Sequence, residues 1–367
     1  MKDISSLYEA AKIYFQSRGI AWFNLKAIDR VVRFLAQNPN FIDSTTVNNA
    51  EILTGLKLAR KGREAGYILK FLWYIGFLNC KYLKGKFYYK LNTTGWKYYK
   101  LRYQQDPRTA FTYLYHIVTT GWEPLLKTLE YIESKKRTSA EDIENDLGGE
   151  MKYWTGIMAN FGFKVKPVKK PYNNFVIKTT LIPLMRELGL IEEENRKYSV
   201  TEQGKHVLER ARREYDVIRT RPREPLIYAA ICNVLLAKES TIISPWIDQE
   251  TAQNIVNGIL QGTNKYTKIT TLRIITKRPD QKTKSALKTL AKLKNHIEVE
   301  AGYITGQQVS LHAKTYHSEK TAIITSANLL RQSLWKNFEL GIHLYQTPPT
   351  LQQTTEEIWQ HTQPYNL

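Results

Sequence analysis

The sequence predicts a multidomain fold in which an α+β part precedes an α/β part. Its 367 residues exceed the ~150–250 at which single domains usually stop growing, so two or three modules are expected. A pattern of helix, hairpin and helix occurs twice before residue 211. After residue 225, short strands alternate with helices, which is typical of an α/β layer with parallel strands.

The charge of the chain predicts a polyanionic partner. Lys and Arg outnumber Asp and Glu by 54 to 34, which gives a net charge of +20. Residues 51–100 alone hold 11 basic and 2 acidic residues, and residues 80–103 interleave lysines with aromatic residues. Lysines contact phosphates, and aromatic rings offer flat faces to sugars or bases. We expect double-stranded DNA as the partner; RNA stays open, and an ordinary solvated face is the alternative.

Several classes of protein are disfavoured by the composition. Cys80 and Cys232 cannot form a disulfide framework, and no Cys-x-x-Cys points to zinc or redox chemistry. The longest apolar stretches, residues 67–80 and 226–237, fall short of the ~20 residues that span a bilayer. The first residues lack a signal-peptide core. We therefore expect a cytoplasmic protein that does not bind a membrane.

The repeated pattern is found in residues 68–101 and 181–210. In each copy an apolar helix ends at a glycine, a charged hairpin follows, and a second glycine introduces a new helix. The two glycines are 19 residues apart in the first copy and 15 in the second, so the first hairpin is longer by four. They are Gly76 and Gly95 in the first copy, and Gly189 and Gly204 in the second.

Both copies resemble the winged helix-turn-helix, whose recognition helix enters a major groove while its wing touches the backbone or the minor groove. The resemblance implies one such domain at residues 1–105 and a second at residues 106–222. We expect a basic insertion at residues 149–174 and a helical connector at residues 206–225. The other expected helices are 25–36 and 47–58 in the first domain, and 123–134 and 140–147 in the second.

The candidate DNA contacts lie on the expected recognition helices, residues 61–75 and 176–188, and on the first wing. The second wing, residues 191–195, is acidic and suits DNA poorly, so a protein contact is the alternative for the second domain. Thr179 and Thr180 are also available on the second helix. The basic candidates are Lys61, Arg63, Lys70, Lys81, Lys84, Lys86, Lys178 and Arg186.

The chemistry of the chain is concentrated near its C-terminus, where His312-x-Lys314 precedes Ser326-x-Asn328 and Glu339. Residues two apart on a strand point to the same face. If the first pair lies on a strand and the second at the end of the next, one face offers a nucleophile, a cation and two neutral donors. Such a set suits a phosphodiester. A satisfied core histidine and a capped turn are the alternatives.

These residues resemble the phospholipase D superfamily motif, in which His-x-Lys is followed by an Asp and then by Gly-Ser-x-Asn. The resemblance implies a catalytic α/β/α domain at residues 223–367. The alternation after residue 225 itself predicts strands at 241–246, 270–276 and 296–304 and helices at 249–260 and 282–294. It departs in two places: Glu319 stands at the Asp position, and Thr325 replaces the Gly after a gap one residue shorter. Neither change removes a group that handles phosphate.

The resemblance implies that His312 attacks phosphorus to form a phosphohistidine, with no metal and no cofactor, while Lys314 and Asn328 hold the other phosphate oxygens. Glu339 either orients His312 or is an ordinary surface acid. Since the chain has one His-x-Lys, two copies would build one site, which implies a homodimer through the C-terminal domain. The remaining histidines near the motif, His317 and His343, are expected to be structural or exposed.

The function predicted from these features is a DNA-binding, metal-independent phosphodiesterase or endonuclease, with restriction-type defence or a mobile element as a natural setting. The alternative is a winged-helix transcription regulator with a phospholipase D-like effector or dimerisation domain. Lipid hydrolysis is disfavoured by the lack of a membrane segment.

Overall fold

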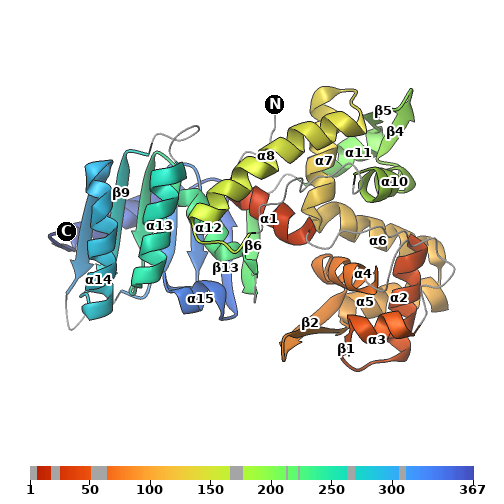
Figure 1. Cartoon of the computed structure of the whole chain (residues 1–367), viewed down its shortest axis with the longest axis horizontal. Coiled ribbons are helices and arrows are strands. Elements are labelled where there is room, and N and C mark those ends of the chain that lie inside the picture. The colour runs from red at the N-terminus through yellow and green to blue at the C-terminus, as the bar shows by residue number, and fades with distance from the viewer. Residues whose placement is uncertain are drawn as a thin grey trace. The chain divides into compact units, whose positions relative to one another are not determined.

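The computed structural model describes residues 6–17, 25–50, 64–165, 177–211, 214–221, 224–262, 269–305 and 311–367. They form two compact units (Figure 1). The first unit contains the described residues of 12–151 and 177–211, and the second contains those of 6–11, 152–165 and 214–367. Helices α1 (Leu7–Ser17) and α8 (Ala140–Asn160) contribute residues to both units.

The first unit combines helices with two small antiparallel sheets. The three-stranded sheet has the order β1-β3-β2, and the two-stranded sheet pairs β4 with β5. The strands are β1 (Ile42–Asp43), β2 (Leu78–Leu83), β3 (Lys86–Leu91), β4 (Ile191–Glu194) and β5 (Lys197–Val200). The helices, besides the two shared ones, are α2 (Leu25–Gln37), α3 (Ser44–Asn49), α4 (Glu64–Tyr74), α5 (Thr93–Gln104), α6 (Pro107–Gly121), α7 (Glu123–Lys135), the π-helical η1 (Ile177–Leu181), α10 (Ile182–Glu187) and α11 (Glu202–Arg210).

The repeat seen in the sequence has a common backbone geometry. Gly76 after α4 and Gly189 after α10 both adopt left-handed conformations, with φ of +85° and +68°. In this region a side chain costs about 1–2 kcal/mol, so glycine is the residue that ends these helices. We call the hairpin of β2 and β3 the first hairpin, and that of β4 and β5 the second hairpin.

The helix that follows each hairpin starts in the same way. Gly95 in α5 and Gly204 in α11 have no room for a side chain: a Cβ there would lie 2.4 Å from the oxygen of Phe77 and 2.3 Å from that of Leu190, respectively. The residue three before each glycine caps the helix, because its side-chain oxygen accepts the glycine N–H at 3.1 Å. These caps are Asn92 and Thr201.

Two expectations for the first unit are wrong. Helix α8 runs to Asn160 and includes the first part of the expected insertion, because apolar residues such as Met151, Ile157 and Met158 continue its buried stripe past Gly149. Thr180, expected to be available to DNA, is fully buried. The rest of the expected helix 47–58 beyond α3 lies mainly outside the described residues. The three-domain division at residues 105 and 222 stays a prediction.

The second unit is built on a nine-stranded sheet with the order β14-β10-β9-β8-β11-β12-β13-β6-β7. Strands β8, β9 and β10 are parallel, as the alternation of strand and helix predicts, and the other neighbours are antiparallel. The strands are β6 (Tyr215–Arg221), β7 (Glu224–Pro225), β8 (Glu239–Ile243), β9 (Thr271–Lys277), β10 (Glu298–Ile304), β11 (Thr315–Ser318), β12 (Ala322–Thr325), β13 (Glu339–Leu344) and β14 (Gln363–Pro364). The helices are α12 (Leu226–Leu235), α13 (Gln249–Gly262), α14 (Gln281–Leu290), the 3₁₀ helix η2 (Ala291–Asn295), α15 (Arg331–Trp335) and α16 (Pro349–Gln360).

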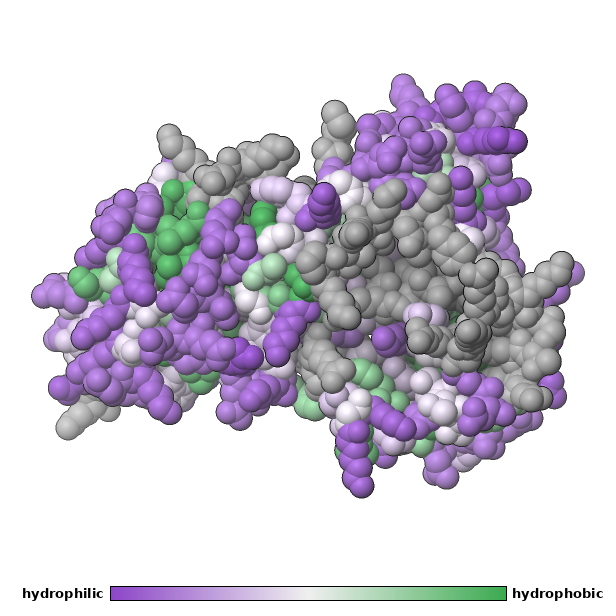
Figure 2. All heavy atoms as spheres, in the orientation of Figure 1, coloured by the Kyte–Doolittle hydropathy of each residue, from purple (hydrophilic) through white to green (hydrophobic). Residues whose placement is uncertain are grey.

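Helices cover one face of this sheet and part of the other. Helix α12 contacts β6, β8, β11, β12 and β13, and α13 packs beside α14 in front of the sheet in Figure 1. On the opposite face, Ile358 and Trp359 of α16 pack on a small core that contains Ile243 and Ile275. In the orientation of Figure 2, hydrophilic residues make up most of the visible surface.

The connector expected to be helical up to residue 225 is wrong from residue 215 onward, where β6 forms and pairs with β13. The usual pattern of buried apolar and exposed polar residues is reversed at the start of β6. Val217 is 66% exposed, while Asp216 on the other face is 6% exposed. Asp216 is satisfied by the hydroxyls of Tyr8 in α1 and Tyr345, which donate to its Oδ2 at 3.2 and 2.6 Å. None of the helices in the described ranges is both long and apolar enough to cross a membrane.

Candidate active site

The two motif pairs lie next to each other at one edge of the nine-stranded sheet. His312 and Lys314 are in the segment 311–314, which leads into β11, and Ser326 directly follows β12. Strands β11 and β12 are antiparallel neighbours, and the Thr325 N–H extends their pairing by donating to the Lys314 oxygen at 3.1 Å. The expected strand position of His312 is wrong, because regular pairing begins only at Thr315. The expected closeness of the two pairs does not depend on it.

Glu339 holds the hydroxyl of Ser326. The Ser326 Oγ donates to Glu339 Oε2 at 2.5 Å and accepts the N–H of Leu340 at 3.1 Å. The other carboxylate oxygen of Glu339 accepts from Asn337 Nδ2 at 3.4 Å. Of the two roles left open for Glu339, orienting His312 has no hydrogen bond to support it among the described residues. Glu339 instead positions Ser326.

The other three motif residues are available to a ligand to different degrees. His312 is exposed, and Lys314 and Asn328 are half-buried. The Oδ1 atom of Asn328 is shielded from solvent and has no hydrogen-bond partner among the described residues. Buried polar atoms are nearly always paired, so such an atom marks a place where a ligand or a water completes the structure.

Two buried hydroxyls fix the segment that carries Ser326 and Asn328. Ser244, at the end of β8, accepts the N–H of Leu329 at 3.1 Å. Tyr316 donates to the oxygen of Ala327 at 3.1 Å, and burial raises the pKa of this phenol, so it stays a donor. The sequence reasoning missed Tyr316, because its contact joins neighbouring strands and leaves no signal in the linear pattern.

Lys277, a cation that the sequence reasoning missed, lies at the end of β9, the neighbour of β8. Lys277 is the last residue of β9, and its Nζ lies 3.8 Å from the centre of the Trp246 ring. Parallel strands bring their carboxyl ends to the same edge of a sheet, where α/β proteins place their ligands. That rule could have identified Lys277 as a candidate, since it is the last residue of a largely buried strand.

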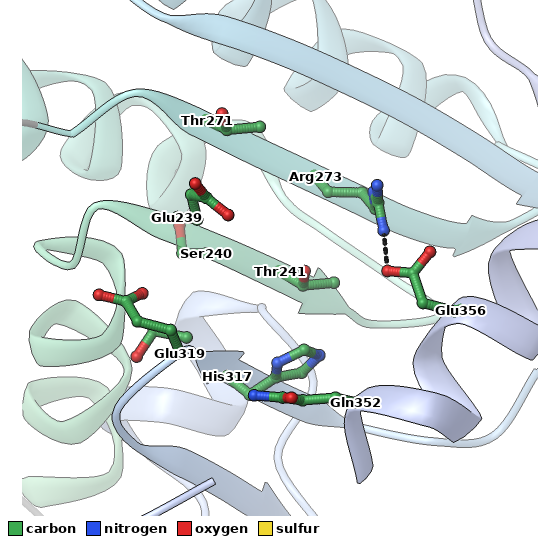
Figure 3. A pocket seen from close by; sticks show the side chains of 10 residues that line it. Glu239, Ser240, Thr241, Thr271, Arg273, His317, Glu319, Gln352 and Glu356 are labelled. Atoms are coloured by element: carbon green, nitrogen blue, oxygen red, sulfur yellow. Dashed lines mark hydrogen bonds and ion pairs between the residues drawn. The ribbon is translucent and has the colours of Figure 1, made fainter. Parts of the chain in front are cut away.

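A polar pocket of about 410 Å³ lies at the opposite ends of the same strands (Figure 3). Arg273 reaches across it to Glu356 of α16 at 2.5 Å, and His317 borders it. His317 bonds Thr355 Oγ1 at 3.0 Å, and burial lowers its pKa, in keeping with the structural role expected for it. His343 is also buried and bonds Thr321 Oγ1 at 2.7 Å. None of the five motif residues lines this pocket.

The candidate DNA contacts of the first unit are spread over three places. Lys81, Lys84 and Lys86 are exposed on the first hairpin, and Lys70 is half-buried in α4. Lys178 in η1 is exposed, and Arg186 in α10 forms an ion pair with Glu193 at 2.7 Å. Lys61 and Arg63 lie outside the described residues. Within the described ranges, no group of three or more His, Cys, Asp and Glu side chains could hold a metal ion.

Residues 234–362 match the family model described as "Cardiolipin synthase, PLD-like domain". The chain carries a C-terminal phospholipase D-like domain. This confirms the resemblance drawn from His312-x-Lys314 and Ser326-x-Asn328. No curated protein matches the sequence.

Solved structures similar to this chain include a phospholipase D family member. The phospholipase D family member Nuc from Salmonella typhimurium is 14% identical, with 42% of this chain and 100% of that chain covered and a TM-score of 0.33. NucT from Helicobacter pylori is 15% identical, with 41% and 100% covered and a TM-score of 0.32. The phosphatidylserine synthase from Haemophilus influenzae is 15% identical, with 57% and 53% covered and a TM-score of 0.33.

Proposed function

We propose that the chain is a DNA-binding, metal-independent phosphodiesterase that cuts DNA as an endonuclease through a phosphohistidine on His312. One observation carries the proposal: His312-x-Lys314 and Ser326-x-Asn328 meet at the carboxyl edge of a phospholipase D-like sheet. The two pairs bring a nucleophile, a cation and an amide to one end of the sheet, and cleavage of a phosphodiester needs such a set.

In the proposed first step, a ring nitrogen of His312 attacks phosphorus. The N–P bond forms as the P–O bond to the leaving oxygen breaks, and that oxygen takes a proton from a second histidine acting as acid. Water then attacks the phosphohistidine, gives a proton to the same second histidine, and releases His312. Lys314 and Asn328 bind the non-bridging oxygens, and Glu339 fixes the Ser326 hydroxyl beside them.

The second histidine is proposed to be His312 of the partner subunit in a homodimer. An uncovered apolar face beside the site supports this. Ile324, Ile342 and Val217 form one row across β12, β13 and β6 and are 44, 40 and 66% exposed. Leu340 on the same face is 59% exposed and lies next to Glu339 in the chain. Apolar patches of this kind on a sheet mark protein contacts.

DNA binding is proposed for the first unit, with its two helix–hairpin–helix segments acting as winged helices. The support is the shared backbone geometry of the two copies and the exposed lysines of the first hairpin. The defence or mobile-element setting expected from the sequence stays a hypothesis about the context in which such an enzyme works.

The central experiment incubates supercoiled plasmid with the full-length protein in excess EDTA. The wild type should nick or cut the DNA, and His312→Ala should lower the rate by about 10³-fold or more because the nucleophile is gone. His361→Ala changes an exposed histidine of the same domain and serves as the matched control. A strict requirement for a divalent metal, or normal cutting by His312→Ala, would contradict the mechanism. Sequence-specific binding without cutting would favour the regulator instead.

The homodimer is tested by mixing wild type with a growing excess of His312→Ala under conditions where subunits exchange. If one site needs His312 from both copies, activity per wild-type chain should fall toward zero as mixed dimers form. Val217→Lys, which places a charge on the apolar face, should give monomers in sedimentation velocity. Full activity per wild-type chain, with exchange verified, would place a complete site in one subunit.

A further inference from the structure

The first hairpin has two chemically different faces. Residues opposite each other across β2 and β3 share a face, and the register pairs Lys81 with Tyr88, Tyr82 with Phe87, and Leu83 with Lys86. The inner face packs its rings on α4, where the centroid of Phe87 lies 5.9 Å from that of Trp73. The other face, which we call the outer face, consists of Asn79, Lys81, Leu83, Lys86, Tyr88 and Lys90.

Aromatic rings contact two lysines of the outer face, Lys81 and Lys90. The Lys81 Nζ lies 4.4 Å from the ring centre of Phe41 and 5.9 Å from that of Tyr88. The Lys90 Nζ lies 4.9 Å from the same Phe41 ring. Asp43 of β1 pairs with Tyr88 of this face, and Lys86 helps to lower the pKa of its carboxyl group, after the larger effect of the Thr46 N–H. The outer face therefore presents positive charge beside aromatic rings.

Leu83 is the exception on this basic face. It is 50% exposed and is the last residue of β2, beside the turn of Lys84 and Gly85. Both turn residues are left-handed, with φ of +46° and +82°, which makes a tight two-residue turn. The tip thus places one apolar side chain between Lys81, Lys84 and Lys86.

We propose that Leu83 is a wedge that enters the minor groove of duplex DNA and partly unstacks one base step, while Lys81, Lys84 and Lys86 neutralise the phosphates on either side. This rests on the DNA binding proposed for the first unit. Proteins that kink DNA from the minor groove insert Leu, Phe or Ile flanked by basic residues. A single side chain that projects from a hairpin tip can enter a groove about 6 Å wide, which a whole two-stranded ribbon cannot.

The test measures binding and bending of a short duplex that carries a fluorophore at each end. All variants are made in the full-length His312→Ala protein, so that the DNA stays intact. Binding of the parent protein should bend the duplex and so change the energy transfer between the two fluorophores. Leu83→Ala should weaken binding by about tenfold and abolish this change, because the leucine side chain that is buried between the bases in the complex is lost. The slope of log affinity against log salt should stay the same, because no phosphate contact is removed.

Three controls separate the wedge from other effects. Leu83→Phe should keep the bend, since a phenyl group can also unstack a base step. Asn79→Ala changes an exposed residue of the same face away from the tip and should bind and bend DNA like the parent. Equal melting temperatures for all variants establish that the fold is intact, as expected for an exposed position.

Three results would overturn the wedge. The first is a Leu83→Ala protein that binds and bends DNA like its parent; the nuclease proposal would survive this, because it depends on His312. The second is binding to vesicles of phosphatidylcholine with anionic phosphatidylglycerol that depends on Leu83 while DNA bending does not. The hairpin would then be a membrane contact. A parent protein that binds no duplex would overturn the wedge and the proposed DNA binding together.

Discussion

The two hairpins of the first unit share a backbone and differ in the charge of their surfaces. Each follows a left-handed glycine and precedes a capped helix whose third residue must be glycine. The first hairpin exposes Lys81, Lys84 and Lys86, whereas the second exposes Glu192, Glu193 and Glu194. In the second, Arg186 and Arg137 pair with two of these glutamates at 2.7 and 2.5 Å.

This difference teaches that the glycines and helix caps determine the backbone shape of the two hairpins. The exposed side chains, which have no part in that shape, determine which kind of partner each hairpin can bind. Arg186, a candidate DNA contact by sequence, is engaged by Glu193 of its own hairpin. Exposed ion pairs add little stability, about 0–1 kcal/mol. They nevertheless neutralise the positive charge of the arginine, which would otherwise attract a DNA phosphate. The comparison therefore favours the first hairpin as the DNA contact and leaves a protein contact open for the second.

The largest effect is expected when the charge that distinguishes the first hairpin from the second is removed. Changing Lys81, Lys84 and Lys86 together to Gln should lower duplex affinity a few hundredfold at ~0.1 M salt and reduce the salt slope by about 2.7. Fluorescence anisotropy across a salt series measures both. The matched variant changes Glu192, Glu193 and Glu194 to Gln and should alter affinity much less. If the salt slope of the lysine variant is unchanged, the first hairpin is not the DNA contact. The basic residues 164–170 would then be the next candidate.

The second effect tests the shared backbone. Gly95→Ala and Gly204→Ala should each lower the free energy of unfolding by about 3 kcal/mol, because each new Cβ would press on a main-chain oxygen. Urea denaturation measures this. Gly149→Ala is the control, since a Cβ there meets open space. If only one of the two glycine variants is destabilised, the hairpins do not share the constraint that we assign to them.

The smallest effect is expected when the turn residues of the two hairpins are exchanged. Lys84 and Asn195 occupy the same left-handed turn position, with φ of +46° and +50°. Lys84→Asn should raise the free energy of unfolding by up to about 1 kcal/mol, because asparagine tolerates this region better. It should also weaken duplex binding, since one charge at the tip is lost. Asn195→Lys should lower stability without strengthening DNA binding; a gain in affinity would give the second hairpin a DNA role.

The candidate site was predictable wherever the signal lies in the linear sequence. His312-x-Lys314 and Ser326-x-Asn328 are motifs of neighbouring segments, so their closeness follows from one tight connection between β11 and β12. The contact of Glu339 with Ser326 was not predictable, because it depends on how β13 pairs with β12. Tyr316 was missed for the same reason, because its role comes from a neighbour in the sheet. Lys277 differs, since its position at the end of a parallel strand could have identified it.

The sequence by itself determined the two hairpin units, the parallel strands β8 to β10 and the phospholipase D-like motif, because each depends on spacing within a few tens of residues. Only the tertiary structure decided that residues 215–221 form a strand. The buried face of β6 carries Asp216, Ile218 and Thr220, so its sequence lacks the apolar alternation of a strand. Its partner β13 lies more than a hundred residues later, and the Tyr8 hydroxyl that Asp216 accepts comes from 208 residues earlier. Local periodicity carries no record of such long-range pairing, which forms only when the chain has folded.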